Sequence, residues 1–261
     1  MAHLFIFGLG YSAKRIRTAM EAFVWRVTAT GSDGELDFAD QAGVRAALAT
    51  ASHALSSVPL RDAGDPVLDR YGDALGHGWL GYLSSTGVYG DTAGAWVDES
   101  ALVGAGRRAA RTEADLAWLA REARVFRLPG IYGPGRSALD RLAQGRAHRI
   151  DLPAQVFSRV HVDDIASAVI AALDAPPGAY NLADDLPTSQ NAMIEEACRL
   201  LGLASPPLRS LDEAGLSSQA RAFYSENRRV ANGKAKRVLG WRPAYPTYRE
   251  GLAAILRQTS P

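Results

Sequence analysis

The feature that most constrains the fold lies at the start of the chain, in residues 3–14. Residues 4–7 form a continuous apolar run that ends at Gly8, a pattern typical of a strand buried on both faces of a parallel sheet. Residues 8–13 then read G-x-G-x-x-A, and residues 14–24 carry apolar side chains at three- and four-residue spacing. The sequence therefore predicts a strand, a tight turn and a helix, in that order.

Each small residue of this turn has a role in binding a dinucleotide. Gly8 permits the tight turn, Gly10 lets the backbone approach a pyrophosphate, and Ala13 lets the helix pack close to the strand. The backbone around Tyr11 and Ser12, at the start of the helix, supplies free N–H groups and partial positive charge for phosphates. An ordinary glycine-rich turn between a strand and a helix is the alternative interpretation of the same residues.

Composition limits the classes of protein to be considered. The net charge of +1 leaves no excess of basic residues for nucleic acid and no acidic tail. A single cysteine, Cys198, excludes an intrachain disulfide and a cysteine-based metal cluster, and its place on the apolar face of a predicted helix favours a buried structural thiol. The N-terminal apolar run is too short for a signal peptide or a membrane span. We therefore expect a cytoplasmic protein with no metal site and no membrane or nucleic-acid partner.

Strands and helices alternate along most of the chain. This pattern predicts an α/β fold with a doubly wound parallel sheet of the Rossmann type and a small C-terminal cap subdomain. Residues 1–134 and 158–183 are assigned to the dinucleotide-binding domain, and residues 135–157 and 184–261 to the cap. The predicted strands are residues 4–7, 25–30, 34–40, 51–59, 79–83, 123–128 and 179–182, and the main helices are residues 14–24, 41–49, 65–75, 107–121, 137–145 and 189–201. The third strand, at 34–40, has no helix before it.

Small and polar residues follow several of the predicted strands. Asp33 follows the second strand, where an acidic residue hydrogen-bonds the adenosine ribose and favours NAD over NADP; a solvated aspartate in a turn is the alternative. Ser56, Ser57 and Ser84 lie at later strand ends, where small side chains leave room for a cofactor across the sheet edge. The cofactor prediction is thus NAD or NADP, with NAD preferred.

Five further motifs follow the glycine turn in a fixed order. They are S-S-T-G-V-Y-G at 84–90, R-L-P-G-I-Y-G-P-G at 127–135, H-V-D-D at 161–164, Y-N-L-A at 180–183 and L-G-W-R-P at 239–243. With these motifs the chain resembles the extended branch of the short-chain dehydrogenase/reductase superfamily, the NAD-dependent epimerase/dehydratase family, over nearly its whole length.

The resemblance implies an NAD(P)-binding Rossmann domain, a small cap, and nucleotide-sugar-like or other small polar substrates in the cleft between them. It implies that Ser85 contacts a substrate carbonyl or hydroxyl, with Thr86 as the neighbouring alternative, and that Pro129 and Ile131 pass beside the nicotinamide. It also implies a possible homodimer formed through the helices at 65–75 and 107–121.

One departure from the family pattern bears directly on catalysis. The family's catalytic pair is a tyrosine followed four residues later by a lysine, and those positions are occupied here by Arg107 and Arg111. A tyrosine hydroxyl has a pKa near 10 unless a neighbouring cation lowers it, and an arginine is too permanently protonated to act as an acid or base. The two arginines share one helix face, so they either clamp a substrate carboxylate or phosphate or are solvated surface residues.

Three hypotheses follow for the function. The first is an oxidoreductase or epimerase in which Ser85 acts with Tyr89 or an ordered water; Tyr132 is a further candidate for proton transfer or substrate contact. The second is a catalytically inactive dinucleotide-binding sensor or regulatory protein. The third is a structural relative that has lost the cofactor, which the intact glycine turn argues against. Whether the chain is an enzyme stays open at this point.

Overall fold

A six-stranded, all-parallel sheet forms the centre of the molecule. The computed structural model describes residues 2–60, 64–76, 78–106 and 109–259. The strand order is β10-β6-β4-β3-β1-β2, which confirms the predicted doubly wound α/β fold. The strands are β1 (His3–Phe7), β2 (Arg26–Ala29), β3 (His53–Ser56), β4 (Trp79–Ser85), β6 (Arg124–Leu128) and β10 (Gly178–Asn181).

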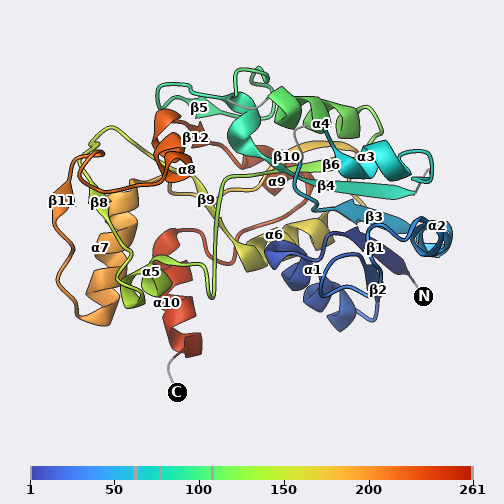
Figure 1. The fold of residues 1–261 in the computed structure, drawn as a ribbon, viewed down its shortest axis with the longest axis horizontal. Coiled ribbons are helices and arrows are strands. Elements are labelled where there is room, and N and C mark those ends of the chain that lie inside the picture. The colour runs from blue at the N-terminus through green and yellow to red at the C-terminus, as the bar shows by residue number, and fades with distance from the viewer. Residues whose placement is uncertain (1, 61–63, 77, 107–108, 260–261) are drawn as a thin grey trace.

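Helices cover both faces of this sheet (Figure 1). Helices α1 (Tyr11–Ala22) and α6 (Val162–Ala171) pack on one face, and α2 (Gln41–Thr50), α3 (Pro66–Tyr71) and α4 (Ala109–Leu119) on the other. Within β1, Leu4 and Ile6 belong to the first core, whereas Phe5 and Phe7 belong to the second. Because successive side chains of a strand point to opposite faces, a strand covered on both sides must be apolar at every position.

The predicted strand at 34–40 is wrong. This segment makes a single bridge, between Thr30 and Leu36, and otherwise consists of turns and bends. The Glu35 carboxylate accepts a hydrogen bond of 2.9 Å from the Ala29 N–H, so a side chain occupies a donor of the β2 edge that another strand would otherwise use. The Glu35 carboxylate is also paired with Arg17 of α1 at 2.6 Å. Because the Glu35 side chain occupies this backbone donor, no further strand of the described chain pairs with β2, and the sheet ends there.

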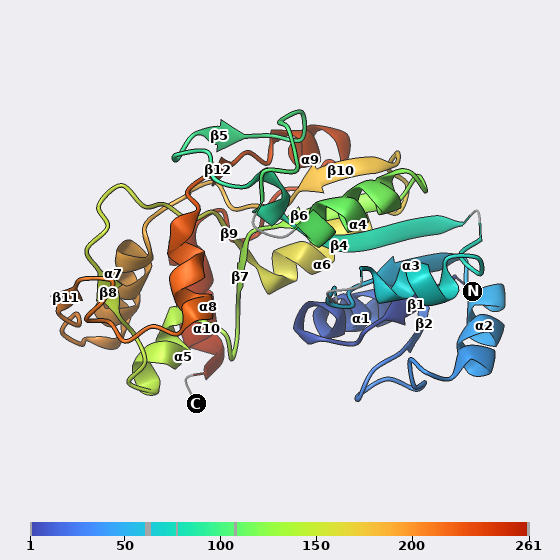
Figure 2. The ribbon, with the colours of Figure 1, turned by 45° about the horizontal axis from the view of Figure 1, so that its top comes forward.

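A second, smaller group of elements lies at one end of the sheet (Figure 2). Tyr132, Leu139, Met193 and Leu252 pack in its core. Cys198 is a free, buried thiol on the apolar side of its helix, as predicted. The elements here are α5 (Ala138–Ala143), β8 (Arg149–Ile150), α7 (Gln190–Leu201), β11 (Leu208–Arg209), α8 (Ser218–Arg221), η2 (Ala222–Ser225) and α10 (Tyr248–Thr259).

Short strand pairs connect this cap to the main sheet. Strand β7 (Gly130–Tyr132) pairs with β9 (Arg159–His161), and β5 (Trp96–Val97) pairs with β12 (Arg229–Val230), both in parallel. The chain then returns to the sheet, because Trp241, beyond α9 (Gly233–Val238), packs in the core beside α1 and α6. Among the described residues, no helix has the length and apolar character needed to cross a membrane.

A buried ion pair lies where β4, β6 and α4 meet. The Arg127 guanidinium donates to both carboxylate oxygens of Asp115, at 2.6 and 3.1 Å, and the two side chains are 3 % and 0 % exposed. Asp115 also accepts from the Ser84 hydroxyl at 2.6 Å, and Arg127 donates to the Tyr89 hydroxyl at 3.0 Å. Tyr89, in η1 (Thr86–Tyr89), donates in turn to Asn181 of β10 at 2.8 Å. Three elements of the sheet edge, β4, η1 and β10, thus supply the polar atoms that this charge pair needs in a buried site.

A second buried pair of ionisable groups, Arg159 and Asp184, lies between β9 and the start of α7. Arg159 donates to the carbonyls of Phe157, Thr188 and Ser189 and to the side chain of Gln190. Asp184 lies nearby and is 3 % exposed, but one of its carboxylate oxygens has no hydrogen-bond partner within the described part of the chain. Burial raises the pKa of Asp184 to about 8, and the Arg159 charge offsets only part of that effect.

Replacement of Arg127 tests the first of these arrangements. We expect Arg127→Met to lower the free energy of unfolding by about 3–5 kcal/mol, because Asp115 is left as a buried charge without its cation. The double variant Arg127→Met/Asp115→Leu should recover part of the loss, since no charge is then buried. Urea unfolding measures both, and a single variant within about 1 kcal/mol of the native protein would contradict the role given to the pair.

Replacement of Asp184 tests the second arrangement, the buried Arg159–Asp184 pair. Asp184 has a pKa of about 8 in the folded protein and an ordinary aspartate pKa in the unfolded chain. At pH values between these two, the carboxyl is protonated in the folded protein and ionised in the unfolded chain. Rising pH through this window therefore removes stability, by up to about 1.4 kcal/mol per pH unit. Asp184→Asn lacks this titration, so its stability relative to the native protein should increase from about pH 5 to pH 8 in urea unfolding. Parallel pH profiles of the two proteins would exclude the shift.

Candidate functional site

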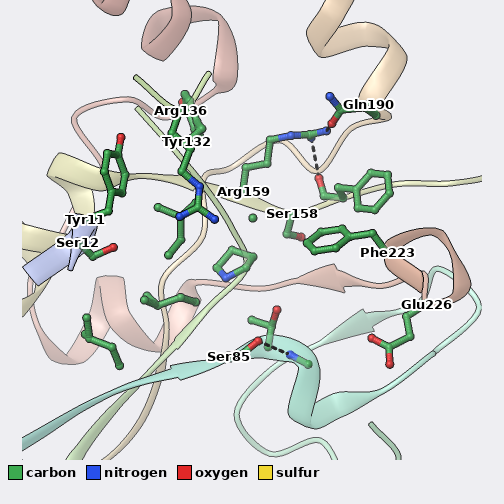
Figure 3. Close-up of a pocket in the computed structure, with 18 of the residues that line it drawn as sticks. Tyr11, Ser12, Ser85, Tyr132, Arg136, Ser158, Arg159, Gln190, Phe223 and Glu226 are labelled. Carbon is green, nitrogen blue, oxygen red and sulfur yellow. Dashed lines mark hydrogen bonds between the residues drawn. The ribbon is translucent and has the colours of Figure 1, made fainter. Parts of the chain in front are cut away.

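One long cleft runs along the carboxyl ends of the central strands and into the cap (Figure 3). Its volume is about 1680 Å³, larger than the pockets of about 300–1,000 Å³ that hold a single small ligand. It begins where β1 has β2 on one side and β3 on the other, which is the point of an open α/β sheet where ligands bind. The cleft therefore has room for a dinucleotide and a second molecule.

The glycine turn forms the floor of the cleft at this end. Gly8 has a φ of +81°, a conformation that side chains rarely adopt, and its N–H donates to the Thr30 hydroxyl at 3.0 Å. The Ser57 hydroxyl donates to the Gly8 carbonyl at 2.8 Å. A Cβ added at Gly10 would meet nothing within 4 Å, whereas Ala13 is fully buried. The turn is thus held rigidly from two strands and leaves open space above Gly10.

Helix α1 begins at this turn without a side-chain cap. Gly10 stands at its N-cap position and makes no side-chain hydrogen bond, whereas α2, α3, α5 and α7 each begin with a capping Asp or Ser. The N–H groups of its first turn therefore have no side-chain acceptor, which suits an anion. Tyr11 and Ser12 both line the cleft, and the Tyr11 hydroxyl donates to the Pro134 carbonyl at 3.1 Å. Tyr11 thus links the glycine turn to the loop before α5.

Three residues predicted to bind the cofactor, Ala13, Ser56 and Asp33, do not line the cleft, and Ala13 is fully buried beneath the turn. Ser56 is fully buried, because it points to the opposite side of its strand from Ser57, which does line the cleft. Asp33 forms an exposed ion pair with Lys14, while the neighbouring Ser32 lines the cleft. The Lys14 ammonium lowers the pKa of Asp33 and draws its carboxylate toward α1.

The other predicted residues of the sheet edge do lie together on the cleft wall. These residues come from β4, η1 and the segment after β6, and Ser85 accepts a hydrogen bond of 3.1 Å from the Gly87 N–H, which leaves its own O–H able to donate. Arg111 of α4 also lines the cleft, whereas Arg107 lies outside the described residues. The lining residues of this wall are Ser84, Ser85, Thr86, Pro129 and Ile131.

Both tyrosines considered for proton transfer have buried hydroxyl groups. Tyr89 is 2 % exposed and does not line the cleft, its hydroxyl is engaged by Arg127 and Asn181, and burial raises its pKa. Tyr132 lines the cleft with its ring, but its hydroxyl lies beneath Gly251 of α10, where burial raises its pKa and no hydrogen-bond partner is described. Neither hydroxyl is placed to exchange a proton with a ligand.

The sequence reasoning missed the arginines at the cap end of the cleft. Glu226 is the only carboxylate among the lining residues that the structure describes, and it is paired with Arg228 at 2.8 Å. A signal was present in the sequence, because three of the arginines recur at five-residue spacing, one before α5, one in it and one after it. The arginines that line this end are Arg136, Arg141, Arg146, Arg159 and Arg228.

Comparison with known proteins was made by family model, by sequence and by structure. No family model matches the chain. A curated relative, the 3-diazoavenalumate denitrifying reductase of a Streptomyces species, is 32 % identical over 140 residues. That match spans 49 % of this chain and 45 % of the reductase, so the chain matches less than half of that relative's length.

Solved structures match over nearly the whole chain. A conserved protein of unknown function from Silicibacter pomeroyi is 39 % identical, with a TM-score of 0.88 over 99 % of both chains. The human epimerase family protein SDR39U1, solved with NADPH, is 15 % identical, with a TM-score of 0.76 over 97 % of this chain and 99 % of that one. A UDP-glucose 4-epimerase from Thermotoga maritima, solved with UDP-glucose, is 15 % identical, with a TM-score of 0.77 over 98 % and 99 %. The chain thus has the fold of the NAD-dependent epimerase/dehydratase proteins, in agreement with the resemblance seen in its motifs.

Proposed function

We propose that the chain binds a nicotinamide dinucleotide and acts as an oxidoreductase or epimerase on a small anionic substrate. One observation carries the proposal: the uncapped start of α1 and the open space above Gly10 face a single cleft that continues past Ser85 into the cap. Backbone N–H groups at a helix N-terminus, with no side chain in the way, fit a pyrophosphate. The structural neighbour SDR39U1 was solved with NADPH.

The residues at the two ends of the cleft would bind different molecules. Gly8, Gly10 and the first turn of α1 would hold the pyrophosphate, and Pro129 and Ile131 would flank the nicotinamide. The bound dinucleotide would supply or accept a hydride at that point. Ser85 would donate its O–H to a substrate oxygen, and the cap arginines would hold the substrate's negative charge.

Proton transfer would differ from that of the family. The three lysines of the chain are preceded four residues earlier by Gly10, Val230 and Asn232, so no Tyr-x-x-x-Lys pair exists anywhere in the sequence. On the wall at the sheet edge the Ser85 hydroxyl, or a water that it holds, would donate to the substrate, which suits substrates that accept a hydride without strong acid assistance. The Streptomyces relative is named as a denitrifying reductase, which is consistent with an oxidoreductase.

The second candidate is a dinucleotide-binding sensor without catalysis. It is favoured by the burial of the Tyr89 and Tyr132 hydroxyls, which leaves the cleft without a titratable acid at the sheet edge. The two candidates differ in one measurable respect. An enzyme oxidises or reduces its bound dinucleotide when a substrate is supplied, whereas a sensor binds the dinucleotide without turnover.

The charge near Ser32 would set the preference between NAD and NADP. The Asp33 carboxylate favours the free ribose of NAD, whereas the Lys14 ammonium paired with it favours the 2′-phosphate of NADP. Calorimetric titration with the oxidised and reduced forms of both cofactors measures these affinities. Tighter binding of NAD indicates that the ribose lies near the Asp33 carboxylate, and tighter binding of NADP that it lies near the Lys14 ammonium. Asp33→Asn should shift the ratio of the two affinities toward NADP.

Substitution of Gly10 tests the cofactor site directly. Gly10→Val places its side chain in the open space above the turn, so we expect stability close to that of the native protein and a loss of dinucleotide affinity of more than about tenfold. Gly76→Val is a matched control, because a Cβ at that exposed glycine also meets nothing within 4 Å and lies outside the cleft. Unchanged dinucleotide affinity in Gly10→Val would refute the pyrophosphate role.

A further inference from the structure

Arg141 is the centre of a positively charged group at the cap end of the cleft. It has no ion-pair partner within the described residues, and the adjacent Asp140 is engaged by Ser137 in the cap of α5. The neighbouring guanidinium groups of Arg136, Arg146 and Arg159 oppose its charge, as the effects on the pKa values of Arg141 and Arg159 show. Four like charges are therefore gathered around one end of a cavity.

Such a group attracts an anion. Arg136, Arg141 and Arg146 are solvent-exposed and line the cleft, and partial burial lowers the pKa of Arg141. Arg136 likewise has no carboxylate partner among the described residues and lies over the ring of Tyr11, 5.7 Å from its centre. A bound anion would relieve the repulsion between these cations and would gain two or more charge-assisted hydrogen bonds.

Some of the other polar groups at this end already have partners inside the protein. The Gln190 side-chain oxygen accepts from Arg159, and the Ser158 hydroxyl accepts from the Val230 N–H. Glu226 is paired with Arg228. Among the described lining residues this end of the cleft thus has several arginines and a single, paired carboxylate, a charge balance that favours an acid group over a neutral sugar.

Aromatic and apolar side chains form the rest of the wall. Phe223 of η2 is 58 % exposed and projects into the cleft beside Ser158 (Figure 3). Its ring centre lies 6.2 Å from that of Phe157, and the Tyr224 ring lies 5.6 Å from Phe157 at an interplanar angle of 88°. Exposed rings of this kind bind flat, unsaturated groups by stacking and by edge contacts.

We propose that the cap end of the cleft binds a planar, conjugated carboxylic acid, with its carboxylate on Arg141 and Arg136 and its unsaturated body against Phe223 and Phe157. This inference deepens the proposed function and rests on it, because it names the class of substrate that would share the cleft with the dinucleotide. A substrate of this class differs from the nucleotide-sugar-like molecules that the sequence resemblance implies.

Titration calorimetry with trans-cinnamate as the probe tests the proposal, both in the cofactor-free protein and in the protein saturated with the better-binding dinucleotide. We expect cinnamate to bind, and neutral cinnamamide and non-planar cyclohexanecarboxylate to bind at least about tenfold more weakly. Arg141→Gln should weaken cinnamate binding by about tenfold or more, and Phe223→Ala should weaken it while leaving the preference for the acid over the amide. Arg199→Gln, an exposed arginine of the same cap that does not line the cleft, is the matched control.

The outcomes separate this proposal from the proposed function. Cinnamate binding that Arg141→Gln and Phe223→Ala weaken, while their melting temperatures and dinucleotide affinities match the native protein, supports the site. Tight binding of UDP-glucose or inorganic phosphate without cinnamate overturns it, and so does cinnamate binding that neither variant changes. If the dinucleotide binds and no organic acid does, this inference fails alone. If no dinucleotide binds, the proposed function fails, and cinnamate binding to the cofactor-free protein still decides the site.

Discussion

The buried contact between Arg127 and Asp115 is the interaction on which the edge of the cleft depends. A parallel sheet covered on both faces has no water at its centre, so a charge there needs a complete set of polar partners. Those partners are Ser84 at the end of β4, Tyr89 in η1 and, through Tyr89, Asn181 in β10. The pair therefore ties three neighbouring strands and the turn after β4 together at their carboxyl ends. Ser85, which follows Ser84 directly, receives its position on the cleft wall from this network.

The sheet and its main helices could be predicted because their signals are local. The apolar run of β1, the helix spacing of α7 and the cap residue Ser189 are each contained in a few consecutive residues. The short strands had no such signal. Trp96 pairs with Arg229, so the β5–β12 contact depends on segments far apart in the chain and on strands of two residues, too short for any periodicity. The segment at 34–40 failed for a different reason: Glu35 satisfies the β2 edge with its side chain, which a pattern of apolar and polar residues does not reveal.

The same division holds for the candidate site. The glycine turn is a local motif, and its geometry agrees with the roles predicted for Gly8 and Gly10. Ser56 and Ser57 are adjacent in sequence, and only the register of β3 decides which one lines the cleft. Arg127 was visible only as part of a family motif, although an arginine inside an apolar strand already implies a buried acidic partner. The cap arginines come from the loop before α5, from α5 itself, from the loop after it, from β9 and from residue 228, and only the folded chain brings them together.

The near-exclusive use of arginine for positive charge has a chemical consequence for this cleft. Lysine can lose its proton when it is desolvated, and it can lower the pKa of a nearby tyrosine, whereas arginine keeps its charge and presents a fixed fork of donors. A cleft whose described lining holds several arginines and no lysine is therefore suited to holding an anion. The hydroxyls of Tyr89 and Tyr132 are buried, and neither faces the ligand. A protein built in this way would depend on its cofactor for the chemistry and on its own side chains for selection and orientation of the substrate.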